Sequence, residues 1–171
     1  RDNNLVKGIG LSLNRNSNLD ISRVTLSYPH LVFHIILGVH TPLDIKKFIE
    51  DYKLDNPTFL ILGYKEWGNG SWYKNVNPKA IDGVIDWWKE DIQKLFSICN
   101  LSFDNLAIKQ LDMKRFFKED EWNKYYMGDD GKFTMYIDLV KMGYAKSSTS
   151  TERFKIQVGD NLTSIFKRIR E

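Results

Sequence analysis

The chain has 171 residues, of which 42% are hydrophobic, so it can form one domain with a substantial core but is short for two ordinary domains. Its 25 basic and 22 acidic residues give a net charge of +3 that is spread along the chain, and nucleic-acid binding is therefore not indicated. The single cysteine, Cys99, excludes an internal disulfide framework and a self-contained cysteine-ligated metal cluster. No apolar run approaches the roughly 20 residues that span a bilayer, and we expect a cytoplasmic protein.

The first part of the chain alternates between strand-like and helix-like segments. Residues 6–14 have a β-type composition and residues 18–28 have a loosely helical pattern. Residues 30–40 form a nearly unbroken apolar run, which is typical of a strand buried on both faces. A Thr-Pro helix start then predicts a helix over residues 41–53.

The second part continues this alternation. An apolar strand is predicted over residues 58–63 and leads into a loop rich in Gly, Trp and Tyr. An Asn-Pro start and one apolar stripe predict the longest helix over residues 77–99. A short strand ends near Phe103 and precedes a helix, residues 118–132 contain a short amphipathic helix closed by a turn, and residues 133–140 are the last apolar strand.

This order predicts a single α/β domain over residues 1–171, with a parallel sheet of about five strands and right-handed crossover helices. The sheet could be open or curled into a barrel. Because the sequence begins with Arg1 and enters a strand within a few residues, two interpretations stay open: a longer parent protein, and a processed or tagged terminus.

Polar residues stand in or after the predicted strands, where parallel α/β proteins place their chemistry. The pocket candidates are Asn14, His40, Lys65, Ser102, Asp104, Tyr136 and Asp138. Asp138 interrupts an apolar strand, and we expect it to face a crevice within reach of Lys65 or of other polar strand ends. The alternatives are turn or cap roles for Asn14 and Asp104 and a structural ion pair for Asp138.

Two further groups of residues are considered for binding. The three histidines lie close together in sequence but lack partners at ligand spacing, so no metal site is expected. Trp67, Trp72 and Tyr73 belong to a loop that could stack a base or nucleoside, or that could fold over the rim of the sheet.

The segments "LILGYK", "SFDNLA" and "MGDDGKFTMYIDLV" resemble the later strands and C-terminal tail of uncharacterised radical SAM proteins of phages and mobile elements. The resemblance covers most of the chain and implies the later half of a partial (β/α) barrel, with S-adenosylmethionine and a [4Fe-4S] cluster as the family's cofactors. The family's three-cysteine motif, C-x3-C-x2-C, is missing from this chain. We therefore expect the chain alone to hold neither cofactor and to be catalytically inactive.

The resemblance also implies roles for the strand ends, which would line the mouth of the barrel. Asp104 and Asp138 would accept hydrogen bonds from hydroxyl groups, and Lys65 would hold a carboxylate. An N-terminal half-barrel or a partner chain would complete the barrel, and a homodimer is a further possibility. Two other functions stay open: a short phage-encoded binding or inhibitor protein, and a small-metabolite-binding α/β domain.

Overall fold

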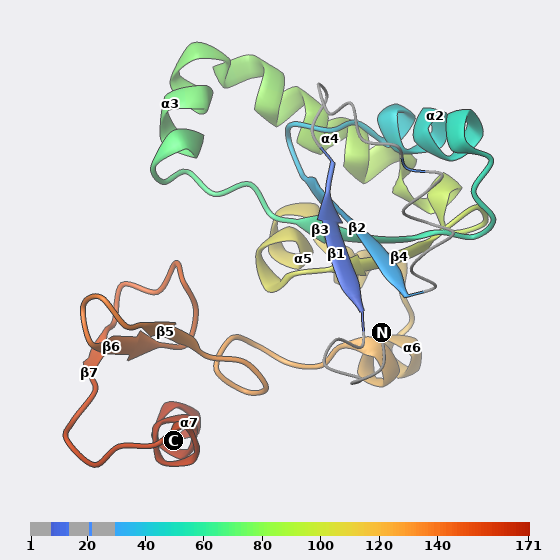
Figure 1. The fold of residues 1–171 in the computed structure, drawn as a ribbon. Helices are drawn as coiled ribbons and strands as arrows, with labels where there is room; N and C mark the ends of the chain where they lie inside the picture. Colours follow the sequence, from blue (N-terminus) through green and yellow to red (C-terminus); the bar gives the residue numbers. More distant parts are fainter. Residues whose placement is uncertain (1–7, 14–20, 22–29) are drawn as a thin grey trace. The chain divides into compact units, whose positions relative to one another are not determined.

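The computed structural model describes residues 8–13, 21 and 30–171, and the chain divides into two compact units, Arg1–Phe117 and Lys118–Glu171 (Figure 1). The helix predicted over residues 18–28 lies outside the described residues, apart from Ile21, which is buried. No helix in the described ranges combines the length and the apolar character needed to cross a membrane.

The first unit contains a four-stranded parallel sheet. Its strands follow the order β1-β2-β3-β4 and comprise β1 (Ile9–Ser12), β2 (Leu31–Ile36), β3 (Thr58–Leu62) and β4 (Asn100–Phe103). Every neighbouring pair is parallel, and Phe33 pairs with both Leu11 and Phe59 in the central register. Four of the five predicted strands are thereby confirmed as one parallel sheet.

Five helical segments within residues 30–117 accompany this sheet. They are α2 (Pro42–Tyr52), α3 (Asn69–Val76), α4 (Pro78–Leu95), α5 (Asn105–Leu111) and the 3₁₀ turn η1 (Met113–Phe116). Helix α2 begins with a capping box in which the Thr41 hydroxyl accepts the Asp44 N–H at 3.1 Å and the Asp44 carboxylate accepts the Thr41 N–H at 2.7 Å. The segment predicted as a Gly-, Trp- and Tyr-rich loop contains α3, so that prediction was wrong over these residues.

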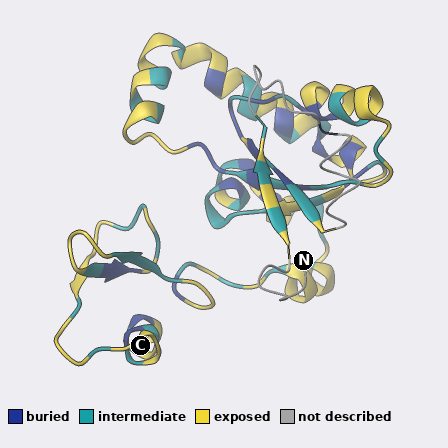
Figure 2. Ribbon diagram, viewed as in Figure 1, coloured by how far each residue is buried: buried dark blue, intermediate teal, exposed yellow. Residues whose placement is uncertain are grey.

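The core of the first unit lies on one face of the sheet. Phe33 and Phe59 are buried there, and Phe48 from α2 packs against both rings, with centroid distances of 5.0 and 6.1 Å. Helix α2 lies beside α4, which carries several buried positions (Figure 2), and Trp88 of α4 is fully buried. The crossovers from β2 to β3 and from β3 to β4 therefore place their helices on the same face of the sheet.

The opposite face of the sheet carries half-buried and exposed side chains. They are Gly10, Ser12, Val32, His34, Ile36, Leu60, Leu62, Asn100 and Ser102. A Cβ at Gly10 would overlap the His34 imidazole unless that side chain shifted. We call this surface the open face.

The second unit has a smaller antiparallel architecture. It comprises α6 (Glu119–Tyr125), the sheet β5-β6-β7 with strands β5 (Tyr136–Asp138), β6 (Gly143–Ala145) and β7 (Phe154–Lys155), and α7 (Leu162–Arg170). Its core consists of Tyr144, Ile165 and Ile169, with partly buried apolar side chains around them.

The prediction that residues 133–140 form a strand of the parallel sheet was wrong. Only Tyr136–Asp138 form a strand, and this strand pairs antiparallel with β6. The reason lies in the connection: four residues separate β5 from β6, whereas a parallel crossover needs about a dozen. Among the described residues, the parallel sheet thus has four strands instead of the predicted five.

Candidate functional site at the carboxyl edge of the parallel sheet

The carboxyl ends of β2, β3 and β4 meet at one edge of the parallel sheet, which is where α/β proteins commonly bind ligands. His40 and Lys65 follow β2 and β3, Ser102 lies within β4, and Asp104 follows it. The first unit therefore contains four of the seven predicted pocket residues in or next to this edge. Asn14 lies outside the described residues.

The Asp104 side chain links the end of β3 to the start of α5. Its side chain caps α5 by accepting the Ala107 N–H at 2.7 Å, and the same oxygen accepts the Gly63 N–H from the end of β3 at 2.9 Å. Gly63 is necessary because a Cβ there would overlap Leu106 and the Ala107 backbone. The alternative role of Asp104 as a helix cap is thus the one that the geometry supports.

A second link at this edge was not predicted from the sequence. The Gln110 side chain accepts the Tyr64 N–H at 2.8 Å and donates to the Tyr64 carbonyl at 2.9 Å, so it extends β3 as a neighbouring strand would. The two residues are 46 positions apart, so no local sequence pattern predicts that they form hydrogen bonds with each other. The buried Tyr64 hydroxyl donates to the Gly70 carbonyl, and burial, together with the nearby Tyr73 and Glu66, raises the pKa of Tyr64.

His40 is the buried polar residue of the edge, with 8% of its surface exposed. Its Nδ1 accepts the Ile36 N–H at 3.2 Å, and its carbonyl accepts the Trp88 indole N–H at 2.7 Å. These contacts tie the end of β2 to α4. His40 therefore positions the edge and offers little surface to a ligand.

Lys65 and Ser102 are exposed. The Ser102 hydroxyl donates to the Phe59 carbonyl at 3.1 Å, while Lys65 presents an ammonium group directly after β3. Such a group can bind a carboxylate or phosphate at the edge of the sheet.

A pocket of about 240 Å³ lies between α2 and the strands on the helix-covered side of the sheet. Its lining includes Ile35, His40, Asp44, Lys47 and Phe48. Only His40 among these residues was predicted as a pocket residue. Ile35 occurs within an apolar strand, and the other three occur within an ordinary amphipathic helix pattern, so neither segment gives a sign of a cavity.

Tyr136 and Asp138 belong to the second unit. The Asp138 carboxylate accepts the N–H groups of Val140 and Lys141 at 3.1 and 3.0 Å, so it caps the turn between β5 and β6. The Arg153 guanidinium lies 4.9 Å from the centre of the Tyr136 ring. The polar residue inside an apolar strand thus has a local structural explanation.

Cys99 does not have the surroundings of a metal ligand. It is buried, its thiol lies 3.4 Å from the Leu95 carbonyl, and burial raises the pKa of the thiol to about 11. Within the part of the chain that the structure describes, no group of three His, Cys, Asp or Glu side chains is placed to bind a metal ion.

No protein-family model matches the chain, and neither the curated proteins nor the solved structures contain a significant match.

Proposed function

We propose that this chain is one half of a (β/α) barrel of the radical SAM type, supplying residues of the substrate or cofactor pocket but no iron–sulfur cluster. One observation carries the proposal: consecutive strands are neighbours in the order β1-β2-β3-β4, and α2 and α4 lie on the same face. A barrel repeats this single-sided winding, whereas a doubly wound sheet places its helices on both faces.

Two of the segments that resemble radical SAM proteins map onto this edge. "LILGYK" comprises the end of β3 and Lys65, and "SFDNLA" comprises the end of β4 with the Asp104 cap. The third segment, "MGDDGKFTMYIDLV", falls in the second unit. In the proposed barrel, the open face would form part of the interior and would be covered by an N-terminal half-barrel or by a partner chain.

The residues of this chain cannot by themselves ligate the [4Fe-4S] cluster of the radical SAM family. A [4Fe-4S] cluster requires several thiolates, and the chain has only Cys99, whose buried thiol has a raised pKa. Any cluster would need cysteines from the half that completes the barrel. The groups present fit S-adenosylmethionine better, since the Lys65 ammonium can bind its carboxylate and the Ser102 hydroxyl of the open face can bind its ribose.

Equilibrium dialysis with S-adenosylmethionine tests this proposal. Although the missing cysteine motif predicts that the chain alone does not hold the cofactor as the complete family does, the pocket residues present should give weak saturable binding. This binding should weaken about tenfold further in Lys65→Met, because a charged hydrogen bond is lost. Lys46→Met is the matched control, since Lys46 is an exposed lysine on α2 that does not line the pocket. Absence of saturable binding, or equal binding by both variants, would contradict the proposal.

The pocket of about 240 Å³ beside α2 favours a second candidate, a small-metabolite-binding domain. In this case a ligand would be held by Asp44 or Lys47 on the helix-covered side of the sheet. The same dialysis distinguishes the two functions, because Lys47→Met would then weaken binding and Lys65→Met would not.

A further inference from the structure

Exposed apolar side chains are concentrated in the second unit. Among the described residues, nine of the seventeen large apolar side chains that are exposed belong to this unit, although it is the smaller of the two. Single exposed apolar residues are normal on a protein surface, whereas a contiguous group of them indicates an interaction site. The informative members of this set are therefore those that lie together.

Four of these side chains stand in two turns of the small sheet. The turn between β5 and β6 carries Leu139 and Val140, which are 74% and 94% exposed, and the exposed Met142. The turn that follows β7 carries Val158, which is fully exposed. Turns usually hold Gly, Pro, Asn, Asp or Ser, and Met142 even adopts a positive φ of 48°, which favours Gly or Asn. Turn geometry therefore does not explain these apolar residues.

The two turns lie at the same end of the small sheet. Strand β7 runs antiparallel to β6, with Lys155 paired to Gly143, so the chain leaves β7 at the end where the β5–β6 turn enters β6. The Ile156 N–H continues this ladder by donating to the Met142 carbonyl at 2.9 Å. One end of the sheet thus carries all four apolar residues, which we call the apolar tip: Leu139, Val140, Met142 and Val158.

The backbone of both turns has internal hydrogen-bond partners. The Asp138 carboxylate accepts the N–H groups of Val140 and Lys141, and the Asp160 carboxylate accepts the Gln157 N–H at 2.8 Å. Without such acceptors, these N–H groups would be costly to bring into an apolar environment. The two carboxylates therefore lower the cost of burying the apolar tip where water is scarce.

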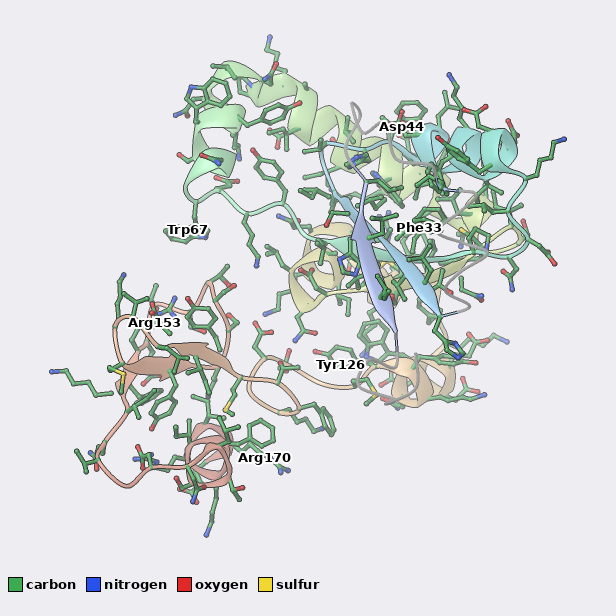
Figure 3. All side chains as sticks on the ribbon, viewed as in Figure 1. Phe33, Asp44, Trp67, Tyr126, Arg153 and Arg170 are labelled. Carbon is green, nitrogen blue, oxygen red and sulfur yellow. The ribbon has the colours of Figure 1, made fainter. Side chains whose placement is uncertain are left out.

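Two cations stand beside the apolar tip. Lys141 lies within the first turn, and Lys155 is paired with Gly143 at the end of that turn. Both lysine side chains are exposed, and neither forms an ion pair with a described residue. Arg153, which Figure 3 labels in this unit, is engaged by contrast, because it donates to the Ser148 carbonyl at 2.7 Å. Lys141 and Lys155 can therefore bind anionic groups next to the apolar residues.

An anionic lipid surface fits this combination better than a protein partner does. A stable protein interface involves about 20 residues on each side, and the apolar tip has four. Shallow insertion into a bilayer needs only a few apolar side chains when cations bind the lipid headgroups at the same time. Residues 132–171 contain eight basic and four acidic residues, so the charge of the surrounding segment also favours an anionic surface.

We propose that the apolar tip inserts into the headgroup region of an anionic bilayer while Lys141 and Lys155 bind the lipid headgroups. In this arrangement the chain lies on the membrane surface and does not span it. This site goes beyond the proposed barrel pocket, because it is built on the second unit and requires neither the parallel sheet nor a completing half.

Co-sedimentation of the whole chain with vesicles tests the proposal. We expect binding to phosphatidylcholine vesicles that contain about 30% phosphatidylserine, and binding about thirtyfold weaker to phosphatidylcholine alone, because the two lysines lose their anionic partners. Leu139→Ser should weaken binding to the anionic vesicles about tenfold, since one apolar side chain no longer enters the bilayer. Leu43→Ser is the matched control: this leucine on α2 is 56% exposed, and its variant should bind as the unchanged chain does.

The contribution of charge is measured in the same assay. Lys141→Gln should weaken binding to the anionic vesicles about fivefold and leave binding to phosphatidylcholine unchanged. Lys46→Gln is the control, because it removes the same charge from an exposed position on α2. Equal effects of the two lysine variants would show that only the net charge of the chain matters and would contradict the role of Lys141.

A fluorescent label distinguishes insertion from adsorption to the surface. Because Cys99 is the single cysteine and is buried, a thiol-reactive nitrobenzoxadiazole attaches to the introduced thiol in Val140→Cys. Lipids brominated on their acyl chains should quench this label and should not quench the same label in Leu43→Cys.

Three results would overturn the proposal: no binding to either kind of vesicle, equal binding by Leu139→Ser and the unchanged chain, or a label at position 140 that brominated lipids do not quench. Self-association that Leu139→Ser abolishes, in the absence of vesicle binding, would equally overturn it and would assign the apolar tip to contact between two copies of the chain.

Discussion

The two units of this chain bury their side chains in different ways. In the first unit, Phe33 and Phe59 of the parallel sheet and Trp88 of the crossover helix α4 are almost completely removed from solvent. In the second, eight strand residues and α7 enclose a core of Tyr144, Ile165 and Ile169. Because buried apolar area supplies most of the folding free energy, we expect the first unit to be the more stable of the two.

The largest effect is expected at Trp88, which is fully buried and donates to the His40 carbonyl. Trp88→Ala should lower the free energy of unfolding by about 4 kcal/mol, because a large cavity forms and the carbonyl loses its partner. Urea denaturation followed by circular dichroism measures this loss. Trp87→Ala is the control and should cost less than about 1 kcal/mol, since Trp87 is partly exposed. Equal losses would contradict the packing described here.

A smaller and more local effect is expected at Ile169, which is 2% exposed in the core of the second unit. Ile169→Ala should cost about 2 kcal/mol. Hydrogen exchange should then accelerate in β5–β7 and α7 and stay unchanged in β2 and β3, if the two units unfold separately. The exposed Lys167→Ala is the control on the same helix. Uniform acceleration over the whole chain would instead indicate one cooperative domain.

The first unit was the more predictable of the two from the sequence. Apolar runs such as residues 30–40, and Thr-Pro and Asn-Pro helix starts, are local signals that the parallel sheet, α2 and α4 confirm. Helix α3 was missed because Gly68, Gly70 and the neighbouring aromatic residues are typical of a loop. Contacts from outside the helix, such as the hydrogen bond from Tyr64 to Gly70, hold it in place.

In the second unit, the hydrophobic pattern of the sequence does not determine which strands pair. Residues 133–140 have the composition of a buried parallel strand, but the partner of a strand is decided by the length of its connection and by the chemistry of its turn. The same ambiguity applies to the candidate site. Asp104 and Asp138 were chosen as carboxylates at strand ends, and the structure uses both to accept backbone N–H groups.

Substitutions at Asp138 test whether its carboxylate caps a turn or binds a ligand. Asp138→Ala should lower the free energy of unfolding of the second unit by about 1 kcal/mol, because the N–H groups of Val140 and Lys141 lose their acceptor. Asp138→Asn keeps an acceptor oxygen and should cost less than half as much. Thermal melting of both variants measures the difference. A ligand-binding role would be indicated instead if Asp138→Asn melted as the unchanged chain does but lost affinity for S-adenosylmethionine.

The smallest effect is expected at the ion pair between Asp160 and Arg168, which joins the start and the end of the α7 segment. The Arg168 guanidinium, followed by the Gln157 N–H, lowers the pKa of Asp160 below its ordinary value of 3.8. The Asp160 carboxylate is therefore harder to protonate in the folded chain than in the unfolded chain. The resulting stabilisation is fully present above the unfolded-state pKa and is lost as the pH falls through the folded-state pKa.

Asp160→Asn should consequently melt at a lower temperature than the unchanged chain at pH 7, and the difference should stay constant down to about pH 5. Below this pH the difference should shrink, and it should disappear once the native carboxylate is protonated. Arg168→Met should show the same dependence on pH, because it removes the other half of the pair. The double variant should then be less destabilised than the sum of the two single variants. Additive losses, or a difference that persists in strong acid, would show that the two side chains stabilise α7 independently of their charges.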